Sequence, residues 1–77
     1  MNLIDEWMQS KKKTYWKVWE CHDTSYEEGS YCWVLFFTEE LEGINATYET
    51  GLSGSEDECK EEIKHAIGVR LESLNLL

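Results

Sequence analysis

The residues best suited to chemistry in this chain are carboxylates, and they are concentrated. Asp and Glu number 16 against 7 Lys and Arg in 77 residues, so the formal net charge is −9. Residues 39–62 hold nine carboxylates and one lysine, which gives −8 for that segment and −1 for the rest. Carboxylates at this density attract the basic side chains of another protein. Eight of these nine form two groups: Glu39, Glu40 and Glu42, then Glu56, Asp57, Glu58, Glu61 and Glu62.

Cysteine and histidine are poorly spaced for metal binding or nucleophilic catalysis. Cys21 and His22 are adjacent, and adjacent residues of a strand point to opposite faces. Cys59 and His65 are six positions apart on a predicted helix, too far round for a catalytic pair. We therefore expect a protein that is not an enzyme and that needs no metal and no cofactor.

Three cysteines, an odd and widely spaced set, predict reduced thiols rather than a disulfide framework. The first residues lack the pattern of a signal peptide, and no apolar run approaches the length of a membrane span. We expect a cytoplasmic protein. The negative charge also argues against direct binding to nucleic acid or to anionic membranes, since both need clustered lysine and arginine.

Apolar periodicity predicts five elements in a single domain spanning residues 1–77. A short helix over 2–12 precedes strands over 14–21, 31–38 and 44–50, and a long helix follows over 56–74. Residues 51–54 are expected to form a flexible loop, and Ser55 with Glu58 has the spacing of a capping box. Short connections between neighbouring strands favour an antiparallel meander. The expected fold class is α+β, a two-layer α-β-β-β-α domain with a three-stranded antiparallel sheet.

Aromatic residues suggest a second surface. Two helices cover only one face of such a sheet, so the other face is open to solvent or to a partner. The strand over 14–21 carries aromatic residues on both of its faces, so periodicity does not say which face is buried. The alternatives are an aromatic core, or an exposed patch with Trp16 and Trp33 as anchors of a dimer or partner interface.

The element order and the segment before the second helix resemble the double-stranded RNA-binding domain. In that family a glycine-containing loop leads into a helix that opens with Ser-Lys-Lys-x-Ala-Lys, and residues 51–60 match that stretch here. Ser55 stands at the serine and Lys60 at the last lysine, whereas Glu56 and Asp57 replace the two phosphate-binding lysines. The resemblance implies the fold, and the inverted charge argues against RNA as the ligand.

In size and charge the chain resembles the DNA-mimic and anti-defence proteins of bacteriophages, anti-CRISPR proteins among them. This resemblance implies a phage-encoded inhibitor that blocks a basic nucleic-acid-binding surface of a nuclease, a repair enzyme or a CRISPR effector. The alternatives are a protein-interaction or dimerisation module that uses the aromatic sheet face, and an accessory subunit of a nucleoprotein machine. A solvated acidic surface that only aids solubility is the plainest interpretation of the charge.

Overall fold

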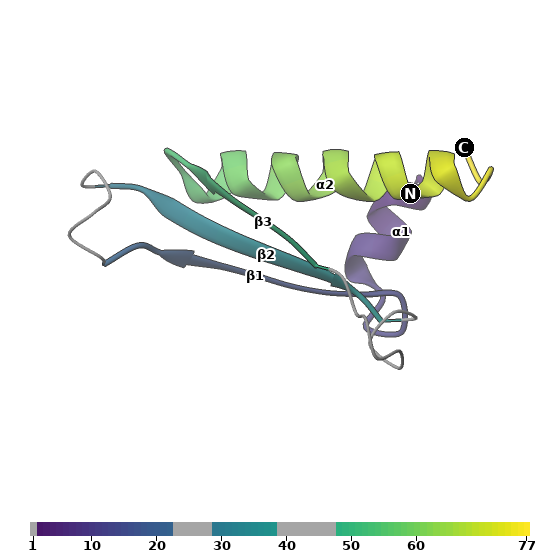
Figure 1. Ribbon diagram of the computed structural model, residues 1–77, viewed down its shortest axis with the longest axis horizontal. Helices are drawn as coiled ribbons and strands as arrows, with labels where there is room; N and C mark the ends of the chain where they lie inside the picture. The colour runs from purple at the N-terminus through teal and green to yellow at the C-terminus, as the bar shows by residue number, and fades with distance from the viewer. Residues whose placement is uncertain (1, 23–28, 39–47) are drawn as a thin grey trace.

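A computed structural model of the chain describes residues 2–22, 29–38 and 48–77. Five elements follow one another: α1 (Leu3–Gln9), β1 (Thr14–Glu20), β2 (Tyr31–Phe37), β3 (Tyr48–Ser53) and α2 (Glu56–Ser73). The strands form one antiparallel sheet in the order β1-β2-β3, with both helices on the same side of it (Figure 1). The predicted α+β fold with the order α-β-β-β-α is therefore confirmed.

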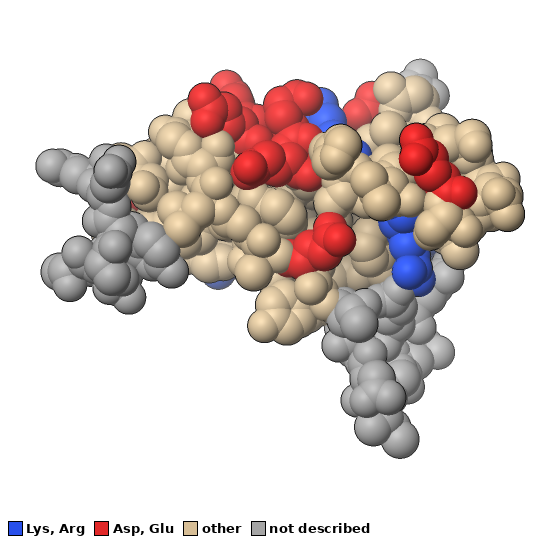
Figure 2. Space-filling view, turned by 45° about the horizontal axis from the view of Figure 1, so that its top comes forward, with Lys and Arg blue, Asp and Glu red and all other residues tan. Residues whose placement is uncertain are grey.

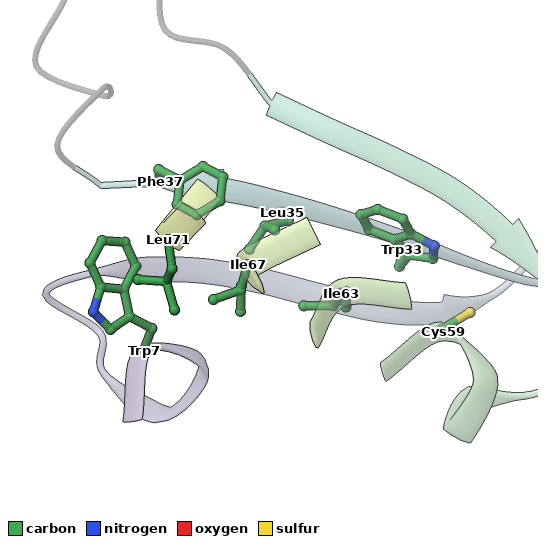
Figure 3. Packing of buried hydrophobic residues seen from close by; sticks show 8 residues of the cluster. All are labelled: Trp7, Trp33, Leu35, Phe37, Cys59, Ile63, Ile67 and Leu71. Carbon is green, nitrogen blue, oxygen red and sulfur yellow. The ribbon is translucent and has the colours of Figure 1, made fainter. Parts of the chain in front are cut away.

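The core lies between α2 and alternate residues of the central strand β2. Trp33, Leu35 and Phe37 point toward the helices, while the residues between them face the other way. Because β2 is central, its alternation fixes the faces of its neighbours through the register of the pairs. Figure 3 shows the cluster that results, made of Trp7, Trp33, Leu35, Phe37, Cys59, Ile63, Ile67 and Leu71.

Trp16 and Trp33 lie on the helix side of the sheet, so the aromatic-core alternative is confirmed and the alternative in which they anchor an interface on the open face is wrong. Trp33 is buried, and the half-buried Trp16 packs against the core. Each indole Nε1–H donates to a helix group: Trp16 to the Met8 carbonyl oxygen at 2.8 Å, and Trp33 to a Glu62 carboxylate oxygen at 2.8 Å. Burying these rings next to acceptors satisfies their N–H groups, which an apolar environment would otherwise penalise.

Local sequence signals set where both helices begin. The Asn2 side chain accepts a hydrogen bond from the Asp5 amide at 2.9 Å, and the Ser55 hydroxyl accepts one from the Glu58 amide at 3.1 Å. Glu58 reaches back to the Gly54 amide, at 3.3 Å, rather than to the amide of Ser55, so the predicted capping box forms with a shifted partner.

Two element boundaries differ from the prediction. The first helix ends at Gln9, and Lys11, Lys12 and Lys13 lie in the turn after it rather than in its last turn. The last strand continues to Ser53, so residues expected in a flexible loop pair with β2. Gly51 belongs in this strand because a Cβ there would lie 2.5 Å from Nε1 of the Trp33 ring, which covers the glycine.

The cysteines also differ from the prediction. Cys21 and Cys32 form a disulfide with their Cα atoms 5.8 Å apart, and Cys59 is a buried free thiol. The pairing of Trp19 with Cys32 across β1 and β2 brings Cys21 into reach, so the expectation of reduced thiols is wrong for two of the three. Neither described helix has the length and apolar character that a membrane span requires.

Candidate protein-binding surfaces

The second acidic group covers the N-terminal half of α2. Glu56, Asp57, Glu58, Glu61 and Glu62 are all exposed, and Figure 2 shows carboxylates gathered over this part of the helix. The positive end of the helix dipole stabilises negative charge in the first turn, which explains how three consecutive acidic residues are tolerated there. The first acidic group, Glu39, Glu40 and Glu42, lies outside the described residues.

Several of these carboxylates already have partners within the chain. Glu58 accepts a hydrogen bond from the Ser53 hydroxyl at 2.7 Å and so belongs to the cap of α2. Glu56 lies 3.6 Å from Lys60, and Glu61 lies 3.4 Å from Lys64, one turn along the helix in each case. Exposed pairs of this kind contribute about 0–1 kcal/mol to stability. The five carboxylates against Lys60 and Lys64 leave a formal charge of −5 + 2 = −3 on this part of α2.

A groove runs between α2 and the edge strand β3, with a volume of about 640 Å³. Trp33, Ala66 and Val69 give it an apolar lining, while Glu61 and Glu62 reach it from the helix. The remaining lining residues are Glu49, Thr50 and His65. The groove therefore combines apolar surface with carboxylates on both walls.

Glu49 lies beside the acidic residues of α2 in the fold but not in the sequence, and it was not among the predicted binding residues. Its pairing with Leu35 puts it on the helix side of β3, where it lines the groove opposite Glu61 and Glu62. The available signal was strand alternation, since the strand predicted over 44–50 placed Glu49 on the face opposite Tyr48. That signal could not show that α2 lies beside this face.

The indole of Trp33 connects the core to this acidic wall. Its ring is buried, and its Nε1–H donates to Glu62 at the groove. A hydrogen bond to a charged acceptor is stronger than one between neutral groups, and it restricts the Glu62 carboxylate to one side of the helix. One wall of the groove is thereby held in place by the core.

The buried thiol of Cys59 lies beneath the same helix turn. Burial raises the pKa of this thiol above its usual value, and the nearby charges of Glu62 and Glu58 raise it further. Its Sγ lies 3.6 Å from the Tyr31 carbonyl oxygen, to which it donates. A thiol with a raised pKa is a poor nucleophile at neutral pH, so Cys59 acts as a small core residue.

A second surface is the sheet face away from the helices. Four apolar residues stand out from it, with exposed fractions of 56% for Tyr15, 40% for Trp19, 59% for Tyr48 and 41% for Leu52. Tyr15 and Tyr48 flank the half-buried Phe36, with ring centroids 6.3 and 5.3 Å from its own, so three rings form a row across the strands. The face also carries Lys17, Val34, Thr50 and the Cys21–Cys32 disulfide.

No group of three or more potential metal ligands comes together within the described residues. No family model matches this chain, and neither a curated protein nor a solved structure matches it. The resemblances to the double-stranded RNA-binding domain and to phage inhibitors therefore remain predictions, and the geometry of the two surfaces carries the functional argument.

Proposed function

We propose that this protein is a small acidic inhibitor, phage-encoded, that binds the basic nucleic-acid-binding surface of a host enzyme or of a CRISPR-type defence complex. The observation that carries the proposal is the exposed row of carboxylates on the first half of α2, which Glu49 extends across the groove. In this role the carboxylates stand where the phosphates of a nucleic acid would bind.

The physical argument rests on long-range attraction. A chain of net charge −9 with most of its negative charge in one segment has a strong local field. Such a field raises the association rate with a positively charged groove and is weakened by salt. The same charges repel one another within the fold, and a basic partner would relieve that repulsion.

The experiment compares two variants of equal charge. The test variant changes Glu56, Asp57 and Glu61 to Lys, and the control changes Glu6, Glu20 and Glu72 to Lys; each moves the net charge from −9 to −3, because three reversals add 6. Proteins are captured from a bacterial lysate at low and at high salt. Each captured protein is then purified and assayed for nucleic-acid binding with and without the inhibitor.

We expect the wild-type chain and the control to displace nucleic acid from a basic protein, with an affinity that falls as salt rises. The test variant should lose at least about tenfold in affinity, because attraction turns into repulsion at three contacts. Equal affinity of the test and control variants, or capture without displacement of nucleic acid, would contradict the proposal.

The exposed aromatic face supports a second candidate function, association with another copy of the chain. Among the described residues this face has Lys17 as its charged member and no carboxylate. Stacking two such faces would put the two acidic helices on opposite outer sides, about 30 Å apart for three layer spacings of ~10 Å. That distance exceeds the screening length of about 8–10 Å at ordinary salt, so the acidic surfaces would not oppose the contact.

Sedimentation from micromolar to millimolar concentration tests this association. We expect a dimer whose population rises with concentration and does not fall with salt, since apolar contacts are not screened. Tyr15→Lys should shift the sample to monomer, whereas Leu76→Lys, at an apolar residue of similar exposure outside the face, should not. A wild-type chain that stays monomeric at millimolar concentration would exclude self-association.

A further inference from the structure

The groove between α2 and β3 continues into a smaller hollow along α2, and the charged residues that line the two differ. At one end Glu49, Glu61 and Glu62 surround the apolar lining formed by Trp33 and Ala66. A second hollow of about 310 Å³ shares Glu49 with the first and extends along α2 to Arg70 and Phe37. The Arg70 guanidinium lies 5.2 Å from the centre of the Phe37 ring, so that end already holds a cation.

This distribution restricts what the larger hollow can bind. Carboxylates on both walls repel an anion, and a fully apolar group would remove water from those carboxylates without replacing its hydrogen bonds. A side chain with an apolar stem and a cationic head satisfies both parts of the lining. The larger hollow, with a volume of about 640 Å³, can hold one such side chain and part of the backbone that carries it.

We propose that this hollow is a binding site for an arginine side chain presented by the basic partner, an inference that rests on the proposed function. The stem of the arginine would lie along Ala66 and Val69, and its guanidinium would lie between Glu49 and the Glu61–Glu62 wall. A guanidinium offers a planar set of donors that matches carboxylates, and it binds aromatic and apolar surfaces better than an ammonium does. Arginine is therefore preferred to lysine.

The Trp33 indole provides a built-in reporter. Its Nε1–H bond to Glu62 must change when a cation pairs with that carboxylate, and the N–H resonance will move with it. Trp7, Trp16 and Trp19 do not line this hollow, so their indole signals serve as internal references. The probe is N-acetyl-arginine amide, titrated at constant ionic strength. The uncharged isostere N-acetyl-citrulline amide is the matched control.

We expect a saturating shift of the Trp33 indole signal with the arginine probe and almost none with the citrulline probe. Glu49→Gln should weaken the arginine probe about twofold to fivefold, as loss of one partly exposed ion pair predicts. Glu72→Gln, on α2 but outside the groove, should leave the affinity unchanged. Equal shifts with both probes, or a Glu49→Gln variant that binds as tightly as wild type, would overturn the proposal.

The same variants separate this inference from the proposed function. If the triple reversal on α2 abolishes binding to a basic partner while Glu49→Gln changes neither partner nor arginine binding, the arginine site is refuted and the inhibitor function stands. If the groove binds arginine but no nucleic-acid-binding protein is displaced from its ligand, the inhibitor function is refuted and the site remains.

Discussion

The acidic groove and the open aromatic face use opposite sides of the same three-stranded sheet. In the groove, carboxylates surround a small apolar lining, and its potential acts over several ångströms. The open face carries rings and aliphatic groups with Lys17 as the charged residue among those described, so it acts only on contact. The acidic groove can therefore attract a basic partner from a distance, whereas the open face can bind a partner only by burying apolar surface in direct contact.

The edge strand β3 contributes to both surfaces. Glu49 lines the groove, whereas Tyr48 and Leu52 stand on the open face. Because consecutive residues of a strand point to opposite sides, neighbouring substitutions on β3 report on different surfaces. Substitutions can therefore test the two surfaces separately.

The disulfide should matter for the open face and not for the groove. Replacing Cys21 and Cys32 by Ser removes the cross-link on that face and should lower the free energy of unfolding by about 2–3 kcal/mol, the value for a closed loop of this size. Denaturant unfolding with and without a reducing agent measures the effect. The wild-type chain should lose stability on reduction while the double variant does not, and an equal response of both would contradict the prediction.

Gly51→Ala should disturb the groove and leave the open face intact. The added methyl group would lie 2.5 Å from Nε1 of Trp33, so the ring must move and its bond to Glu62 must weaken. Overpacking of this kind costs about 1–3 kcal/mol. Thermal unfolding measures the loss, and the Trp33 indole resonance reports the displaced ring.

Gly54→Ala is the matched control for that change. A Cβ at Gly54 meets only a Glu58 oxygen at 3.6 Å, which is ordinary contact, so its stability should stay within about 0.5 kcal/mol of wild type. If both alanine variants lost the same stability, contact with the indole would not be the reason for glycine at position 51.

Ser55→Ala should loosen the start of α2 and with it the acidic wall. Loss of the hydrogen bond from the Glu58 amide costs about 1 kcal/mol, typical of a helix cap. Hydrogen exchange of amides in the first turn of α2 should accelerate, while the amides of β1 exchange as before. Ser73→Ala, at an exposed hydroxyl near the other end of the helix, should change stability less.

Alkaline pH should reveal the environment of Cys59. Burial raises the pKa of its thiol in the folded state above the unfolded value, so the folded chain holds this proton more tightly. The stabilisation is complete below the unfolded pKa of about 9 and is lost as pH rises through the folded pKa. Unfolding measured between pH 7 and 10 should show less decline for Cys59→Ala, although that variant starts from lower stability.

The elements that the sequence predicted well are those with a local signal. An almost continuous apolar run located β2, and the Ser55 cap located the first residue of α2. The end of β3 was missed because Gly51 reads as a loop residue, and only the Trp33 ring packed on it explains a glycine in a strand. Sequence-based rules consider a residue and its neighbours in the chain, whereas the contact between Trp33 and Gly51 joins two different strands.

The candidate functional surfaces depend even more on contacts between residues that are distant in the sequence. Five acidic residues of the second group were predicted to be exposed together, and they are. The face of Trp16 and Trp33 was left open because both faces of β1 carry rings, and the choice depended on where the helices pack. The odd number and wide spacing of the cysteines predicted reduced thiols, whereas the register of β1 and β2 brings Cys21 and Cys32 together.

The alternation along β2 constrains the length of this strand. Inserting or deleting one residue in this strand would exchange its two sets of side chains, moving Leu35 toward solvent and Phe36 toward α2. The core and the open face would be lost in one step, because both depend on alternate residues of β2, and the groove would lose the Trp33 ring. Substitutions can alter either surface independently, but the length of β2 cannot change, so we expect variation in length only in the connections between elements.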